Sequence, residues 1–395
     1  ACGCFIAAKA SSPTTSDSRA KGEMIGIFAA YGFTGSLIAA ELSGTGYPIR
    51  LIGRSPEKLK ALAATIRGNP QLVEADVTDP AAVARALDGL KVLINCAGPF
   101  TDLGEPVLRE ATNRGVNYLD TTGEQSFIRL ALNQYGPIAA EKGSAVIPAC
   151  AFEYALGDAA AAMAAEPFGE CDAITLTYNI AGFGSSRGTK KSVLRVMGLT
   201  GFTRQGGEPT EIPRSAASQV FDLPGVGKRR GYLFSGGEVF MAPLHVSTRD
   251  LSTFMVFPGP RPVVRIFNSL LPALIRSPLG SLASKLVDRG AFGPNEVQRQ
   301  ATEFVILCEA RRNRGSRRVV VKGRDPYGLT ARIAARAAQL IETGKVENTG
   351  GLSPSMLAGH EEIVRVTSAE GVKWEVTDLP VPDARDLHKA AQSHS

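Results

Sequence analysis

Short apolar runs alternate with stretches of helical spacing from Met24 to about residue 150. Such alternation is typical of βαβ units, in which helices connect parallel strands. The apolar runs predict strands at 24–29, 49–53, 71–75, 91–96, 117–120 and 145–147. Helices are expected between them, at 33–42, 56–67, 80–87, 105–114 and 127–142. The pattern therefore predicts a complete doubly wound Rossmann sheet in an α/β domain.

The pattern changes after Pro148. Strand-like segments such as 172–180 are separated by loops rich in Gly and Pro, and a helix returns at 332–341. This change favours a second domain of the α+β class with a mixed sheet. We expect a disordered tail at 1–22, a Rossmann domain at 23–150, a substrate or dimerisation domain at 151–345, and a C-terminal segment at 346–395 that could pack back on the first domain.

A glycine-containing turn follows the first strand. The segment Ala29-Ala30-Tyr31-Gly32-Phe33-Thr34-Gly35 leads directly into a helix. In a dinucleotide-binding turn, glycines permit a tight bend, close approach of the backbone to a pyrophosphate, and close helix packing. Ala29 replaces the first glycine of that pattern. We expect Ala30 to Gly35 to bind phosphate at the helix N-terminus; a turn that serves only packing is the alternative.

The end of the second strand indicates which dinucleotide is bound. An NAD-binding domain usually presents a carboxylate there to the ribose 2′-hydroxyl, but this strand ends in Gly53-Arg54-Ser55 with no acid. Arg54 can offer a planar fork of donors to a 2′-phosphate, Ser55 a hydroxyl and Lys58 a further charge. The residues predict NADP(H), with a surface arginine beside a helix start as the alternative.

Two further strand ends complete the predicted cofactor site. Asp76 and Val77 are expected near the adenine. The segment Asn95-Cys96-Ala97-Gly98-Pro99-Phe100 ends the fourth strand at the topological switch point, where ligands bind. Gly98 permits close approach of the backbone, and Phe100 either covers a cofactor ring or packs in the core.

Polar residues also follow the fifth strand, in Tyr118-Leu119-Asp120-Thr121-Thr122-Gly123-Glu124. Tyr118, Asp120 and Glu124 fall at the same sheet edge and are candidate site residues. For Asp120 and Glu124, capping of a helix or loop is an equal alternative. No Tyr has a Lys four residues later, so the catalytic pair of short-chain dehydrogenases is missing.

With these motifs in order, the sequence resembles the saccharopine dehydrogenase-like oxidoreductases and, among them, the trans-acting enoyl reductases. The resemblance continues beyond the first domain through Pro148-Ala149-Cys150-Ala151-Phe152-Glu153, Ser186-Arg187-Gly188-Thr189 and Gly323-Arg324-Asp325-Pro326-Tyr327-Gly328-Leu329-Thr330. It implies an NADP-binding Rossmann domain, a second domain that dimerises or holds substrate, and hydride transfer to a carbon–carbon or carbon–nitrogen double bond. Two departures are Ala29 and Phe152-Glu153, where the family more often has Phe-Asp.

The first functional hypothesis is an NADPH-dependent reductase of an activated double bond, in an enoyl thioester or another lipid-like or polyketide-like substrate. A saccharopine-type imine reductase is the alternative within the family. Candidates for orienting or protonating the substrate are Tyr118, Asp120, Glu153 and Tyr154. A hypothesis of another class is a non-catalytic NADP-binding scaffold, in which Ala29 marks a decayed turn.

Composition restricts the partners. Much of the +6 net charge lies in a predicted hairpin of strands 303–310 and 317–323, without interleaved aromatic residues, so a nucleic-acid surface is not expected. The six scattered cysteines suit a reducing, cytoplasmic compartment, and no metal site is expected. The basic amphipathic segment 263–286 could rest on a membrane or admit a lipid-like chain, although core or homodimer-interface helices are favoured. No apolar run is long enough to span a bilayer.

Overall fold

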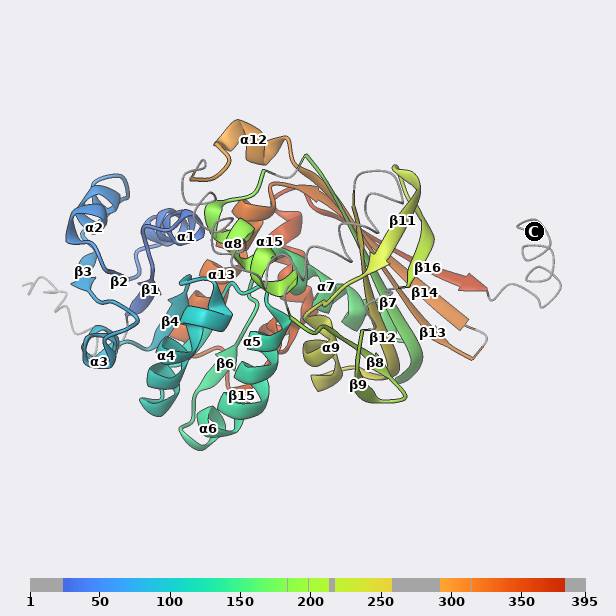
Figure 1. Ribbon diagram of the computed structural model, residues 1–395, viewed down its shortest axis with the longest axis horizontal. Coiled ribbons are helices and arrows are strands. Elements are labelled where there is room, and N and C mark those ends of the chain that lie inside the picture. Colours follow the sequence, from blue (N-terminus) through green and yellow to red (C-terminus); the bar gives the residue numbers. More distant parts are fainter. Residues whose placement is uncertain are drawn as a thin grey trace, which may run out of the picture.

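The computed structural model describes residues 24–182, 184–197, 199–212, 217–257, 292–313 and 315–380, whose strands form two sheets side by side (Figure 1). The first is parallel throughout, in the order β15-β6-β5-β4-β1-β2-β3. Its strand order reverses between β1 and β4, which is the switch point of a Rossmann sheet. The strands are β1 (Ile25–Phe28), β2 (Ile49–Gly53), β3 (Gln71–Glu74), β4 (Val92–Asn95), β5 (Asn117–Asp120), β6 (Ala145–Ile147) and β15 (Gly350–Gly351).

The crossover helices begin at recognisable caps. Ser55 and Asp79 cap α2 and α3 with their side chains, and a proline occupies the first helical position after each. The helices are α1 (Phe33–Ser43), α2 (Pro56–Ala63), α3 (Pro80–Leu87), α4 (Phe100–Asn113), α5 (Gln125–Leu130) and α6 (Gly136–Glu141), with the π-helical turn η1 (Ala131–Tyr135) between the last two.

Two helix predictions need correction. The helix expected to start at residue 105 starts at Phe100, because the Glu124 carboxylate accepts its first N–H groups. The helix expected at 127–142 is interrupted by the π-helical turn. A strand as short as β15 has no periodicity that a sequence pattern could reveal, so this seventh member of the sheet was not predicted.

The second sheet is mixed. Its order is β10-β11-β12-β7-β13-β14-β16, with β8 and β9 attached at β12. β12 runs parallel to β7, and the other pairs are antiparallel. The strands are β7 (Glu170–Ala181), β8 (Phe202–Gln205), β9 (Glu208–Glu211), β10 (Ser218–Leu223), β11 (Gly227–Leu233), β12 (Ser247–Val256), β13 (Glu303–Arg312), β14 (Gly315–Arg324) and β16 (Lys373–Pro380). The predicted fold class, a Rossmann sheet with a second mixed sheet, is confirmed.

Two helices join the sheets. α7 (Phe152–Ala165) packs on β13 and β14, and α13 (Pro326–Glu342) packs on α1 and β4. One apolar core therefore extends from Ile27 of β1 to Ile306 of β13. The remaining helices are α8 (Arg187–Met197), α9 (Glu238–Met241), η2 (Ala242–Leu244), α12 (Glu296–Gln300), α14 (Pro354–Ala358) and α15 (His360–Ser368).

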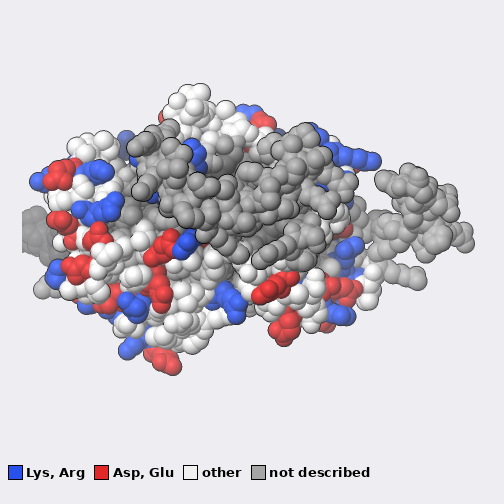
Figure 2. Space-filling model, in the orientation of Figure 1, with Lys and Arg blue, Asp and Glu red and all other residues white. Residues whose placement is uncertain are grey.

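The predicted basic hairpin is β13 and β14, and its charges are largely paired. Arg317 contacts Asp378, Lys322 contacts Glu375, and Arg318 contacts Glu309. The face in Figure 2 likewise mixes acidic and basic side chains over the Rossmann half. These pairs neutralise part of the hairpin's positive charge.

Two segments with predictions fall outside the described residues. The tail at 1–22 and the amphipathic segment 263–286 lie outside the described ranges. Within those ranges, no helix combines the length and the apolar character needed to cross a bilayer, and no cluster of three His, Cys, Asp or Glu could bind a metal.

Candidate functional site

A cavity of about 2070 Å³ lies where the carboxyl ends of the Rossmann strands face the second sheet. Residues that follow β1, β2, β3 and β4 form one wall, and α8, β11 and β12 form the opposite wall. Small-molecule pockets usually have about 300–1,000 Å³. The cavity therefore has room for a dinucleotide and a second molecule beside it.

The turn between β1 and α1 has the shape of a phosphate cradle. The Gly32 N–H donates to the Ala29 carbonyl oxygen at 2.8 Å, and Gly32 caps α1. A Cβ atom on Gly35 would stand 2.6 Å from that carbonyl oxygen, so a larger residue would push the helix away from the strand. The first turn of α1 carries no acidic residue. Its N–H groups and dipole therefore favour a bound anion.

Ala29 adopts the backbone conformation that a glycine normally supplies. Its φ is 56°, in the left-handed region, which costs a non-glycine residue roughly 1–2 kcal/mol. The surrounding turn nevertheless closes, and Ala30 N–H donates to the Ile52 carbonyl oxygen at 3.1 Å. The backbone of Ala29 is therefore strained, but the turn keeps the shape that a glycine would give it.

Arg54 is exposed and lines the cavity directly after β2. Beside it, hydrogen bonds from the N–H and hydroxyl of Thr78, helped by the Arg54 charge, lower the pKa of Asp76. A Cβ atom on Gly53 would stand 2.6 Å from the Tyr31 ring, so the ring packs closely over the strand end. The end of β2 thus combines the Arg54 cation, the face of the Tyr31 ring and the open space of the cavity.

Most of the predicted cofactor residues line this cavity. Tyr31, Gly32, Phe33, Thr34, Arg54, Asp76, Val77, Cys96, Ala97, Gly98, Pro99 and Phe100 line the cavity, whereas Ala30, Gly35, Ser55 and Lys58 do not. Ser55 accepts from the Lys58 N–H and donates to Glu57, so its hydroxyl serves the helix cap. The Lys58 ammonium lies 5.5 Å from the Tyr31 ring centroid.

The segment after β4 is held by buried polar groups. Ala97 N–H donates to Asn95 Oδ1 at 3.0 Å. The N–H groups of Phe100 and Thr101 donate to the two carboxylate oxygens of Glu124, each at 2.8 Å, and the Ser192 hydroxyl donates to the same carboxylate at 2.7 Å. Glu124 therefore caps α4 and links it to α8.

Tyr118 and Asp120 do not line the cavity, which corrects their assignment as groups that touch substrate. Both side chains are fully buried. Asn95 Nδ2 donates to the Tyr118 hydroxyl at 3.0 Å, and Asp120 Oδ1 accepts from the N–H groups of Thr122 and Ala149. Burial raises the pKa of Asp120 to about 7. These residues brace the strand ends, as the capping alternative for Asp120 expected.

Glu153 and Tyr154, the other two predicted catalytic residues, do line the cavity at the start of α7. Burial raises the pKa of the Glu153 carboxyl and raises that of Tyr154 well above its usual range. The Tyr154 hydroxyl donates to the Gly123 carbonyl oxygen at 3.2 Å. Glu153 is therefore the better proton donor of the two, since its proton is held more weakly.

A fully buried acid, Glu238, lies near Glu153. The Tyr178 hydroxyl hydrogen-bonds to the Glu238 carboxylate and to the Glu153 carbonyl oxygen, and Tyr178 lines the cavity. Burial raises the pKa of Glu238 to about 8. This pair was not found from the sequence, because Glu238 comes close to α7 only when β7 and β12 pair.

Comparison with known proteins identifies the first part of the chain. Residues 25–166 match the family model for the saccharopine dehydrogenase NADP-binding domain. This part of the chain is similar to the NADP-binding domain of saccharopine dehydrogenases. The predicted family resemblance and the predicted cofactor, NADP(H), are confirmed.

Relatives of the NADP-binding domain are oxidoreductases by name. A trans-acting enoyl reductase of Mycobacterium ulcerans is 32% identical over 132 residues, and a saccharopine dehydrogenase-like oxidoreductase of Mus musculus is 31% identical over 144 residues. Each alignment covers 32% of this chain, and the two cover 32% and 34% of those relatives. The match thus spans about a third of each curated relative.

The fold likeness extends over both domains. The saccharopine dehydrogenase (L-Glu forming) of Saccharomyces cerevisiae superposes with a TM-score of 0.60, at 13% identity, covering 91% of this chain and all of that one. At this identity the match shows the fold alone.

The residues of the NADP-binding domain fit the cofactor. Only glycine fits at residue 35, where the turn approaches α1, and Arg54 stands at the strand end where the ribose 2′-phosphate is bound in such domains. The pyrophosphate would therefore meet the N–H groups of the cradle, and the ribose 2′-phosphate would meet the Arg54 guanidinium.

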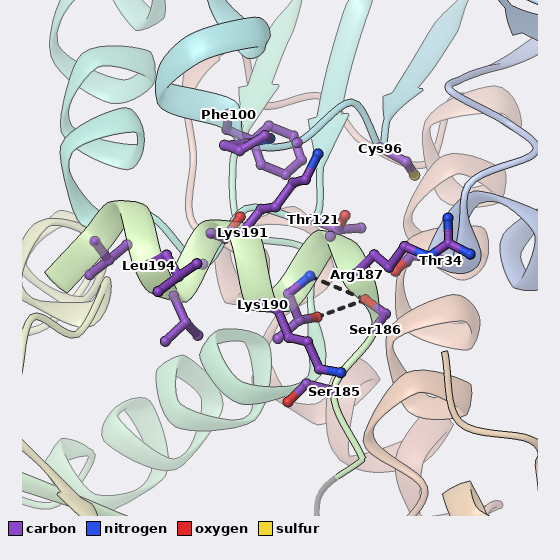
Figure 3. Close-up of a pocket in the computed structure, with 18 of the residues that line it drawn as sticks. Thr34, Cys96, Phe100, Thr121, Ser185, Ser186, Arg187, Lys190, Lys191 and Leu194 are labelled. Atoms are coloured by element: carbon purple, nitrogen blue, oxygen red, sulfur yellow. Dashed lines mark hydrogen bonds between the residues drawn. The ribbon is translucent and has the colours of Figure 1, made fainter. Parts of the chain in front are cut away.

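Residues of α8 also face this cavity, and sequence reasoning assigned them no role. Arg187, Lys190 and Lys191 line it together with Leu194 (Figure 3). In the same view Lys191 reaches toward the Phe100 ring, and Arg187 reaches toward Thr34. The Ser186-Arg187-Gly188-Thr189 motif, followed by two lysines, was the available signal.

Proposed function

We propose that the protein is an NADPH-dependent reductase that adds a hydride and a proton across an activated double bond. The Glu153 carboxyl carries this proposal, because it is a half-buried acid with a raised pKa on the wall of the cavity that the Gly98–Phe100 segment also lines. When bound, NADPH supplies the hydride. The Glu153 carboxyl donates its proton to the other atom of the double bond, and solvent then reprotonates it.

The cavity also supports a substrate with a long apolar part. The wall beyond the lysines of α8 includes the apolar side chains of Leu194, Val196, Leu199, Leu233, Met255, Val256 and Phe257. Burying each CH₂ group contributes about 0.8 kcal/mol. An enoyl thioester with an acyl chain is therefore our first choice, and an imine of the saccharopine type is the alternative within the family.

The test follows oxidation of NADPH at 340 nm with enoyl thioesters of increasing chain length. We expect KM to fall as the chain lengthens, and Glu153→Gln to lower kcat about 10²–10⁴-fold, the usual contribution of a general acid. Glu153→Asp, which matches the residue more common in the family, should retain part of the rate. Turnover of an imine alone would favour the saccharopine-type reaction. Tight NADPH binding without turnover of either substrate would favour the scaffold.

A further inference from the structure

The Ser186–Thr189 motif fastens α8 to the first residue of α1. The Ser186 N–H donates to the Tyr327 hydroxyl at 2.9 Å, and the Thr189 hydroxyl lies 2.8 Å from the same oxygen. The Tyr327 ring in turn packs edge to face on Phe33, with centroids 4.9 Å apart. The N-terminus of α8 is therefore held next to the phosphate cradle of the other domain.

A second set of aromatic contacts leads from Arg187 to the same place. The Arg187 guanidinium carbon lies 5.7 Å from the Phe292 ring centroid, and that ring packs edge to face on Phe33 at 5.8 Å. A Cβ atom on Gly293 would stand 2.3 Å from the Phe33 ring, so the contact needs glycine there. In Figure 3 the guanidinium reaches toward Thr34, in the first turn of α1. Arg187 thus faces the helix end that favours an anion.

The Arg187 side chain is half-buried, and one of its N–H groups lacks an acceptor in the described part of the chain. Its Nε is buried and has no hydrogen-bond partner among the described residues. By contrast Arg195, two turns further along α8, forms an ion pair with Asp102. Neither α1 nor α8 has an acid in its first turn. A buried N–H group without an acceptor is costly, and an anion bound here would supply one.

We infer that Arg187 binds the pyrophosphate of NADP(H), so that the second domain completes the cofactor site. The guanidinium can donate two parallel hydrogen bonds to phosphate oxygens on the side opposite the N–H groups of α1. Because α8 also carries the lysines that face the cavity, this one helix lines both the cofactor site and the substrate part of the cavity. The inference rests on the NADP-binding domain and not on the proposed reductase activity.

The experiment measures dissociation constants of NADPH, NADH and adenosine 2′-monophosphate by fluorescence and calorimetry. NADPH and NADH share the pyrophosphate, which the monophosphate lacks. We therefore expect Arg187→Ala to weaken NADPH and NADH by the same factor, about 10- to 100-fold, and to leave the monophosphate unchanged. Arg54→Ala should instead weaken NADPH and the monophosphate and leave NADH unchanged.

Three controls make the result decisive. Arg195→Ala, on the same helix, should leave all three ligands unchanged. Arg187→Met keeps the apolar stem that packs on Phe292, and should weaken binding like the Ala variant with an unchanged unfolding midpoint. Arg187→Lys should recover part of the affinity. Wild-type NADPH affinity in the Met variant would overturn the inference, and a raised substrate KM with that affinity unchanged would assign Arg187 to a substrate anion.

Discussion

The Phe100 N–H donates a 2.8 Å hydrogen bond to the Glu124 carboxylate, 24 residues further along the chain. Because Thr101 N–H uses the other oxygen, this buried acid satisfies the first two donors of α4. Replacing Glu124 by Gln puts an NH₂ group against one of these donors, and we expect a loss of about 1–3 kcal/mol in unfolding free energy. Urea denaturation measures it. Ser192→Ala removes one hydroxyl but leaves both N–H groups satisfied, so an equal loss in that control would argue against the capping role.

Glu153 predicts the pH dependence of turnover. Burial raises the pKa of its carboxyl, and the proposed donor is the protonated form. We therefore expect kcat to fall as the pH rises through the pKa of Glu153, which lies above the usual value for Glu. A pH profile of kcat should show this limb in the wild type and lose it in Glu153→Gln. A limb that persists in the Gln variant would show that another group donates the proton.

Ala29 predicts a stabilising substitution. Since its φ of 56° suits glycine, Ala29→Gly should raise the unfolding free energy by about 1 kcal/mol without weakening NADPH. The matched control is Ala61→Gly, at an exposed position inside α2, which should lower stability by about 1 kcal/mol. Equal losses in both variants would contradict the strain at residue 29.

Asp158 of α7 pairs with the His245 ring and also contacts the backbone of α14 in the C-terminal segment. His245 Nε2 lies 2.7 Å from Asp158 Oδ1, and the Ser355 N–H donates to Asp158 Oδ2 at 2.9 Å. Burial is the largest single influence and opposes both charges, but the partner's charge and the hydrogen bonds together outweigh it. The pKa of His245 is therefore raised and that of Asp158 is lowered.

The signs define a pH window for stability. The His245 contribution is complete below its unfolded pKa of about 6.5 and is lost as pH rises through its raised folded pKa. The Asp158 contribution is complete above about pH 4 and is lost as pH falls through its lowered pKa. Urea midpoints should therefore be highest between about pH 4 and 6.5 for this pair. His245→Asn should remove the decline on the alkaline side, and an unchanged decline would assign it to other groups.

The sequence predicted the Rossmann half because its information is local. Strand and helix periods, the turn before Phe33 and the arginine after Gly53 each lie within a few residues of the structure that they specify. Tyr118 was misplaced because a strand end fixes the sheet edge and leaves open the face on which a side chain lies. Here that face is the apolar core.

Local sequence patterns could not predict which residues of the second domain line the site. Arg187 approaches α1 only through contacts of Tyr327 and Phe292 with Phe33, which join segments far apart in the chain. Glu238 meets Tyr178 through the pairing of β12 with β7. The domain limits, a homodimer, the cytoplasmic location and contact of segment 263–286 with a membrane stay predictions.

Binding of NADPH and NADH to the wild type and to Arg54→Ala is the most direct measurement, with Arg67→Ala as the exposed control outside the cavity. Charged hydrogen bonds contribute about 1.5–3 kcal/mol. The wild type should therefore prefer NADPH, and Arg54→Ala should lose about 10- to 100-fold in NADPH affinity while binding NADH as before. Equal affinities for both dinucleotides in the wild type, or equal losses in the variant, would contradict a 2′-phosphate site at Arg54.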